Sequence, residues 1–223
     1  MHIPDGILPP TIAIGGYAIT GGMTWYSLKK ISHCGHPSEQ IPRASLLTAG
    51  FFVASLIHIP IPPSSIHLVL NGLVGVILGY FSFPAILIGL FFQAVMFQHG
   101  GLSSLGVNAA MMGIPAILAY HVFQLRHSLP KGERWANGLA FIAGGGALGL
   151  SALIFTVLVV TTIPAEVNAE LERRAIYIGL AGYSVQALIE GTFTLLLVSF
   201  FRRVKPELLS DAIDNSELPL NNK

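Results

Sequence analysis

Long apolar runs, separated by short turn-forming stretches, dominate the pattern of this chain. A helix needs about 20 mainly apolar residues to cross the core of a bilayer. The pattern therefore predicts an all-α membrane protein with seven transmembrane helices. The stretches PIPPSS, SFP and QHGGLSSLG mark breaks between neighbouring runs. The predicted spans are approximately residues 8–28, 44–59, 66–82, 84–98, 106–125, 136–163 and 175–201.

Charge supports the membrane assignment and predicts an orientation. Only 10% of the 223 residues are charged, against about a quarter in an ordinary soluble domain, and none occurs between Arg43 and Arg126. Ten of the twelve Lys and Arg residues fall on one side of the predicted spans, in the first and fifth connecting loops and the tail. The positive-inside rule then places the N-terminus outside and the C-terminus in the cytoplasm. A net charge of +1 offers no basic surface for nucleic acid.

The chain is expected to form one membrane domain followed by a short tail. Residues 1–209 are predicted to be a single integral membrane domain, and the polar residues 210–223 a disordered cytoplasmic tail. The first residues lack the basic region and small-residue cleavage site of a typical signal peptide, so we expect them to be retained. The glycines of the sixth span predict close helix packing: Gly144, Gly145, Gly146 and Gly149.

Histidines gather on the predicted outer side, where they indicate a metal site, although polar residues at a membrane interface would have the same distribution. The terminal position of His2 favours the metal site. The amine of Met1, the amide nitrogen of His2 and its imidazole Nδ1 can form two fused chelate rings. One further imidazole completes a four-nitrogen set that suits Ni(II) or Cu(II) and can hold Co(II). Pro4 stiffens this segment, and Asp5-Gly6 offers a turn. The outer histidines are His2, His58, His67 and His99.

His67 is the preferred fourth ligand, because it opens the third span at its outer rim. Asn71 follows one helical turn later on the same face, where it can hydrogen-bond the second imidazole nitrogen. The alternative is that His67 is an interfacial residue at a helix start capped by a serine. His58 and His99 are alternative ligands, or groups that support the ligands.

Glu190 is the only charged residue within the seventh span. Ionisable groups inside membranes are costly and usually functional, which suggests a metal ligand or a proton relay. Its position near the middle of the span, away from the outer site, favours at least equally a structural hydrogen bond to a neighbouring helix.

Four segments carry a family resemblance: MHIPDG at the start, SSIHLVLNGLVG, FQHGGLSSLGVNAAMMGIP and IEGTFTLLLVSFFRRVKPELL. Together they resemble the substrate-capture subunit of energy-coupling-factor transporters for cobalt and nickel, the CbiM/NikM family, from residue 1 to about 209. The resemblance implies a seven-helix protein whose N-terminus folds back into the bundle and binds the transported Co²⁺ or Ni²⁺, with no permanent cofactor. The ligands it implies are the amine of Met1, the amide and imidazole nitrogens of His2, and His67.

The same resemblance implies several partners in a bacterial or archaeal cytoplasmic membrane. These are a transmembrane coupling subunit, two cytoplasmic ATPases and often a small accessory membrane protein. The chain has no GxxxxGK[ST] sequence, so ATP hydrolysis and other enzymatic activity are not expected of it. Cobalt is slightly preferred, because the family is often linked to cobalamin synthesis, and nickel is close behind.

Two other functions compete with metal capture. A secondary transporter or channel for a small solute would use broken spans near the midplane of the membrane and would not need His2. An intramembrane metalloenzyme would need a motif such as HExxH, which the sequence lacks. Capture of cobalt or nickel for an ATP-driven importer is preferred to both.

Overall fold

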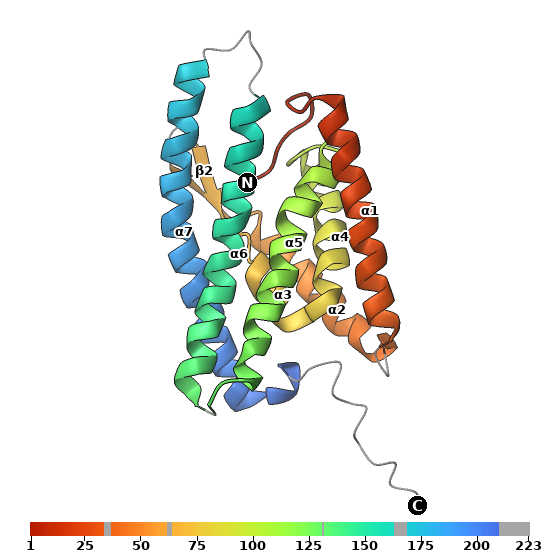
Figure 1. Cartoon of the computed structure of the whole chain (residues 1–223), viewed down its shortest axis with the longest axis vertical. Coiled ribbons are helices and arrows are strands. Elements are labelled where there is room, and N and C mark those ends of the chain that lie inside the picture. Colours follow the sequence, from red (N-terminus) through yellow and green to blue (C-terminus); the bar gives the residue numbers. More distant parts are fainter. Residues whose placement is uncertain (34–36, 62–63, 131, 163–168, 210–223) are drawn as a thin grey trace, which may run out of the picture.

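The computed structural model describes residues 1–33, 37–61, 64–130, 132–162 and 169–209, and for residues 58–61, 64–67 and 169–176 it describes the backbone alone. The predicted disordered tail, residues 210–223, lies outside this part of the chain. Nearly all of the described part is helical (Figure 1). The α-helices are α1 (Pro10–Ser32), α2 (Pro37–Ala54), α3 (Asn71–Leu78), α4 (Ser82–Phe97), α5 (Leu105–Gln124), α6 (Glu133–Thr162) and α7 (Ala169–Val204). Short 3-10 turns follow three of them: η1 (Gly79–Phe81), η2 (Leu125–His127) and η3 (Pro206–Leu208).

The longer helices run beside one another along the long axis of the molecule (Figure 1). α5 packs against α1, α3, α4 and α6, and α6 packs along α7. Within the described residues, four stretches are long and apolar enough to cross a membrane, as expected of a helical membrane protein. They are Asn71–Phe97, Leu105–His127, Glu133–Thr162 and Tyr177–Val204.

A β-hairpin takes the place of the C-terminal end of the predicted second span and the N-terminal end of the predicted third span. The predicted boundaries 44–59 and 66–82 are therefore wrong. α2 ends at Ala54, and β1 (His58–Ile61) pairs with β2 (Ser64–His67) in antiparallel register. The prolines of the sequence PIPP explain the difference, because proline lacks an N–H group and fixes φ, which prevents this stretch from continuing a helix. Pairing of the two strands satisfies main-chain groups that a helix would otherwise satisfy.

α3 begins inside the bundle rather than at its edge. The helix has eight residues, a length of about 12 Å, and all eight are buried. Leu70 starts it with a left-handed backbone, φ 53°. The chain then turns through η1 into α4, and Pro84 lies in the first turn of α4, where a proline is tolerated.

Close helix contacts confirm part of the glycine prediction. A Cβ on Gly145 would lie 2.6 Å from the carbonyl oxygen of Ala187 on α7, and a Cβ on Gly144 would overlap Thr194. For Gly146 and Gly149 the prediction is wrong, since an added Cβ would meet no described atom within 4 Å. α6 and α7 therefore approach closely over one short stretch.

Two arginines hold the end of the described chain against the bundle. Arg43 of α2 donates hydrogen bonds to the carbonyl oxygens of Ile77 and Leu208, and Arg126 donates to that of Leu209 at 2.9 Å. Leu209 packs into the core between these contacts, with 9% of its surface exposed. The end of the described chain therefore belongs to the packed domain.

Candidate metal centre

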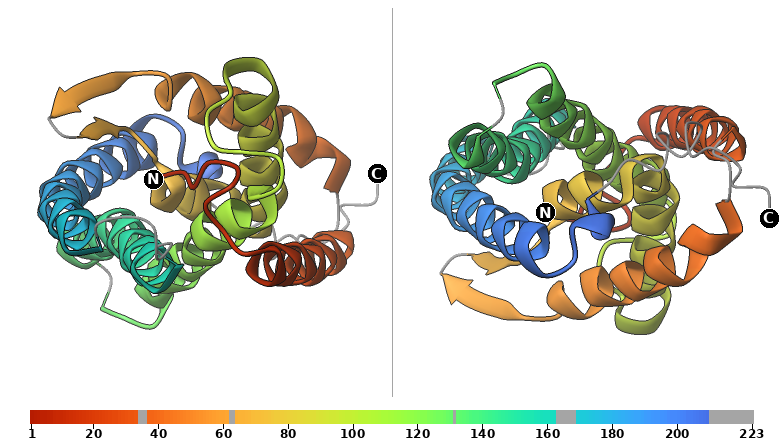
Figure 2. Two further views of the ribbon diagram at one scale, coloured as in Figure 1. Left: turned by 90° about the horizontal axis from the view of Figure 1, so that it is seen from above. Right: turned by 90° about the horizontal axis from the view of Figure 1, so that it is seen from below.

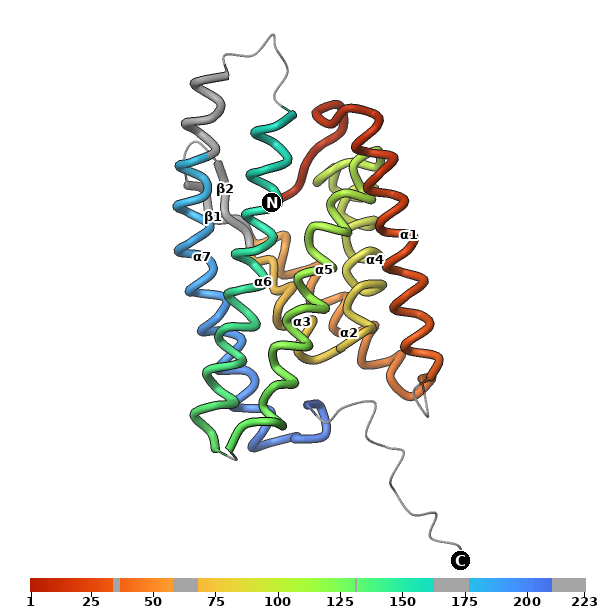
Figure 3. The backbone as a smooth tube through the Cα atoms, in the orientation of Figure 1, coloured from red at the N-terminus to blue at the C-terminus, as the bar shows by residue number. Residues whose placement is uncertain are grey.

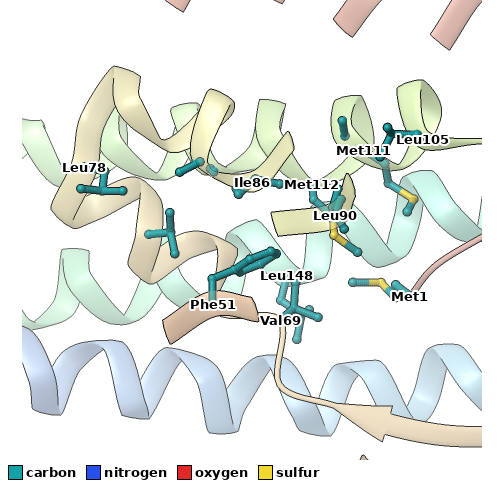
Figure 4. Packing of buried hydrophobic residues seen from close by; sticks show 14 of the residues in the cluster. Met1, Phe51, Val69, Leu78, Ile86, Leu90, Leu105, Met111, Met112 and Leu148 are labelled. Atoms are coloured by element: carbon teal, nitrogen blue, oxygen red, sulfur yellow. The ribbon is translucent and has the colours of Figure 1, made fainter. Parts of the chain in front are cut away.

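The first nine residues form an arm that enters the bundle from the end where α1 begins. The backbone passes from the start of α1 inward, so that the N-terminus lies among the helices both in the views along the axis (Figure 2) and from the side (Figure 3). Met1 is 3% exposed and Ile3 is 0% exposed. The side chain of Met1 lies in an apolar cluster with Val69, Met112 and Leu148 (Figure 4). The arm is therefore an internal element of the fold.

Asn108 of α5 holds the arm beside His2. Its Oδ1 accepts a hydrogen bond from the backbone N–H of Ile3, and its Nδ2 donates to the carbonyl oxygen of Ile3, both at 3.0 Å. Ser104 Oγ donates to the same carbonyl at 2.5 Å. Both main-chain polar groups of Ile3 are thus fixed, which restricts the position of the preceding residue.

Asp5 anchors the outer part of the arm to the loop between α4 and α5. Its carboxylate accepts hydrogen bonds from the backbone N–H groups of Leu102, at 3.2 Å, and Ser103, at 2.8 Å, and from Ser103 Oγ at 2.5 Å. The hydroxyl bond of Ser103 is the largest cause lowering the pKa of Asp5. The predicted Asp5-Gly6 turn is confirmed, with Gly6 at φ 85°.

His99 is the aromatic neighbour of His2. The two ring centroids lie 4.2 Å apart at an interplanar angle of 61°, and both ring nitrogens of His2 are buried. The following residue, Gly100, has φ 85°, and a Cβ there would lie 3.5 Å from Cδ2 of His2. The structure therefore brings two of the four outer histidines together.

The other two outer histidines, His58 and His67, lie opposite each other in the register of the hairpin. Their side chains are outside the described part of the structure, so the predicted ligand role of His67 stays a prediction. Asn71, its predicted partner, donates hydrogen bonds to the carbonyl oxygen of Met112, at 3.1 Å, and to Ser151 Oγ, at 2.9 Å. The described bonds of this amide thus tie α3 to the helices around it.

Glu190 covers the start of α3 from the neighbouring helix α7. Its two oxygens accept hydrogen bonds from the N–H groups of Val69, at 2.6 Å, and Leu70, at 2.9 Å, and Gln186 Nε2 donates at 2.9 Å. The sequence suggests a hydrogen bond to a neighbouring helix, whereas these donors are two main-chain groups just before α3 and a side chain of α7 itself. The arm descends into the bundle and brings the N-terminus toward Glu190: Val69, which donates to Glu190, packs in the same apolar cluster as Met1.

The amine of Met1 is suited to bind a metal ion at neutral pH. Burial lowers its pKa from 8.0 to about 5, and the negative charge of Glu190 offsets only part of this effect. A ligand nitrogen must be unprotonated to bind a metal. A lowered pKa favours the neutral amine, the protonation state that metal binding requires.

The side chains that the structure describes do not by themselves form a metal-binding group in this region. Among the residues that the structure describes, no three His, Cys, Asp or Glu side chains gather in a group that could hold a metal ion. The predicted ligand set differs in kind, since two of its nitrogens belong to the main chain. The described geometry brings together Met1, His2 and the neighbouring His99.

Sequence reasoning missed the residues that hold the arm. Asn108, Ser103 and Ser104 all lie in the segment LSSLGVN, whose polar positions interrupt an otherwise apolar run. Polar side chains at the start of a buried helix need partners, and that requirement was the available signal. What the sequence does not reveal is that the partner is the N-terminal arm, about a hundred positions away.

Replacing Asn108 with alanine is expected to weaken metal binding while leaving the ligands intact. The change removes both hydrogen bonds to Ile3, and loss of a group that orients metal ligands typically lowers affinity by about 10- to 100-fold. Isothermal titration of purified N108A with Ni²⁺ measures this. Ser184→Ala on α7, an exposed serine bonded within its own helix, is the matched control. An N108A affinity equal to that of wild type would contradict the anchoring role.

Comparison with known proteins gives a match over nearly the whole chain. Residues 2–208 match the family described as cobalt uptake substrate-specific transmembrane region, CbiM. A putative metal transport protein of Haemophilus influenzae is 35% identical over 158 residues, covering 69% of this chain and 74% of its own length. A putative metal transport protein of Haloquadratum walsbyi is 30% identical, and the match covers 98% of this chain and 97% of the relative. A putative fused nickel transport protein of Archaeoglobus fulgidus is 28% identical, and the match covers 99% of this chain and 72% of the relative.

A solved structure described as a truncated transition metal transporter has the same fold. Its TM-score is 0.77 at 20% sequence identity, and the match covers 91% of this chain and 99% of that one. A second structure, described as a transition metal transporter, also matches with a TM-score of 0.77. This match covers 92% of this chain and 93% of that one. The helical arrangement is therefore not peculiar to this sequence.

Proposed function

Because the chain belongs to the CbiM family of cobalt uptake transmembrane proteins, we propose that it captures Co²⁺ or Ni²⁺ for an ATP-driven importer of the energy-coupling-factor type. Membership makes it a membrane component of cobalt or nickel transport. The observation that carries the finer proposal is the buried N-terminal arm, whose main chain is held at Ile3 beside a histidine at position 2. This arm delivers an amine, an amide and an imidazole to one place.

The proposed ligands are the Met1 amine, the amide nitrogen and Nδ1 of His2, and an imidazole nitrogen of His67. Four nitrogens in this arrangement suit late first-row divalent ions. The bonds that Asn108 and Ser104 make to the residue after His2 support the set, because an arm that is already ordered loses less entropy when it binds. His99 packs against the ring of His2 and is proposed to orient it. His58 remains an alternative ligand.

The proposed topology has seven helices embedded in the membrane, with the N-terminus outside and the C-terminus in the cytoplasm of a bacterial or archaeal cell. In support, α1 begins and α7 ends at opposite ends of the bundle (Figure 1). The Lys and Arg residues of the loops and tail belong to the end where α7 ends. The metal would then enter from outside, where the arm begins.

The proposed partners are a transmembrane coupling subunit, two cytoplasmic ATPases and a small accessory membrane protein. The fused architecture of the Archaeoglobus relative supports a partnership with another transport subunit, since this chain covers 72% of that protein. Cobalt is slightly preferred as the substrate, in line with the description of the family, and nickel is close behind, in line with the name of that relative.

The test is a titration of the purified protein with Ni²⁺ and Co²⁺, monitored by calorimetry and visible absorption. Wild type is expected to bind both ions. His67→Ala is expected to lose at least about 10- to 100-fold in affinity, because loss even of a group that only supports the ligands has that effect. Its absorption band should also shift, because one ligand is replaced. His127→Ala, in η2, is the control. An unchanged band in H67A would exclude His67, and absence of binding by wild type would favour a carrier for a different small solute.

A further inference from the structure

Glu190 is a buried carboxylate whose hydrogen bonds reach the segment between the hairpin and α3. It is 1% exposed, and among the side chains that the structure describes it is the only carboxylate that is buried. Its partners Val69 and Leu70 follow His67 by two and three positions. Together with the amide of Gln186, three N–H groups donate to the two carboxylate oxygens. This arrangement suits an ionised carboxylate, which can only accept.

The start of α3 would otherwise be unfavourable for a nearby cation. The first N–H groups of a helix have no partner within it, and together they give the N-terminus of the helix a partial positive charge. Because α3 begins inside the bundle, water cannot screen this charge as it does at a surface. The carboxylate of Glu190 accepts from the N–H groups of Val69 and Leu70, the two residues just before α3, and so places a negative charge beside the positive end of the helix.

The same carboxylate is close to the arm. Val69, which donates to Glu190, packs in one apolar cluster with Met1 (Figure 4). The charge of Glu190 also acts on the Met1 amine. The start of α3, the carboxylate and the N-terminus therefore share one buried region.

We propose that Glu190 is the counter-charge of the metal site: it neutralises the positive end of α3 and balances the charge of the bound divalent ion. This inference rests on the proposed function. A divalent ion bound by one deprotonated amide and three neutral nitrogens keeps a single positive charge, and a buried charge without a partner is costly. One carboxylate supplies a negative charge that offsets it. Glu190 acts through space and is not itself a ligand.

The experiment compares Glu190→Gln with Glu190→Asp in the full-length protein by titration with Ni²⁺. E190Q keeps the size of the side chain and removes its charge, so its affinity is expected to fall by about 10- to 100-fold, the usual effect of losing a group outside the ligands. E190D keeps the charge and should bind more tightly than E190Q. The absorption band of bound Ni²⁺ should be the same in all three proteins. Glu133→Gln, which removes an exposed carboxylate, is the charge control.

Three results would overturn the proposal. Equal affinities of E190Q and wild type would remove the charge effect, equal losses in E190Q and E190D would leave only a packing role, and a shifted band in E190Q would make Glu190 a ligand. If E190Q does not fold, Gln186→Lys and Gln186→Met test whether the charge of Glu190 affects metal affinity. The lysine of Q186K is expected to pair with Glu190 and to weaken binding relative to the methionine variant, and equal affinities would again overturn the proposal.

A one-residue N-terminal extension is measured alongside these variants. An extended protein that binds as wild type does would refute the terminal chelate itself, whatever the Glu190 variants show. If the extension abolishes binding while E190Q binds normally, the proposed function stands and only the counter-charge fails.

Discussion

Adding one alanine before Met1 is expected to lower the affinity for Ni²⁺ or Co²⁺ by at least about 100-fold. Four-ligand structural metal sites bind with about 10–16 kcal/mol, so one ligand is worth about 3 kcal/mol, or about a factor of 100. The extension changes no side chain of the protein. It moves the amine by one residue, and it also has to displace Met1 from an apolar cluster in which it is 3% exposed.

Calorimetric titration of the extended and unextended proteins measures this effect. Mass spectrometry of each protein identifies the residue that carries the free amine. The control adds the same alanine after Lys223, at the other end of the sequence, and should bind as wild type does. Tight binding by the protein extended at its N-terminus would refute the terminal chelate.

Replacing His2 with alanine is expected to have an effect of similar size. The variant loses the imidazole ligand, worth about 3 kcal/mol by the same reasoning, and also the ring packed against His99 at 4.2 Å. The amine and amide remain, so weak binding with a shifted absorption band should persist. Cellular uptake of Co²⁺ or Ni²⁺ should fall in parallel.

This prediction also separates metal capture from the competing function. A secondary transporter for a small solute would tolerate the loss of His2, because its site would lie among broken helices near the midplane. His33→Ala, at the C-terminal end of α1, is the matched control, and it should bind as wild type does. Unchanged metal affinity in His2→Ala would favour the solute transporter.

Much of the architecture follows from local patterns in the sequence. The apolar runs predict the helices within a few residues at many ends, and α5 is expected at 106–125 and found at Leu105–Gln124. Such runs are readable because the periodicity of a helix is a property of its own residues. The region of β1 and β2 is the exception, since a short apolar stretch with several prolines does not distinguish a strand from the end of a helix.

The candidate site could be predicted only in part. His2 stands out because it lies in MHIPDG, one of the segments that carry the family resemblance. The neighbour of its ring, His99, is only one of several candidates until the fold brings the two together. For Asn108 the sequence indicates only a polar residue that needs a partner, because that partner, Ile3, lies 105 positions away.

The sequence by itself determined the membrane class, the helical character and the family resemblance, and it suggested the candidate chelate at the first residues, because composition, periodicity and short motifs are local properties. Only the tertiary structure decided that the arm lies inside the bundle, that α3 begins there, and that Glu190 accepts from the two N–H groups just before α3, across 121 and 120 positions of chain. Those features depend on which distant segments pack together, and packing is a property of the whole chain rather than of any one stretch.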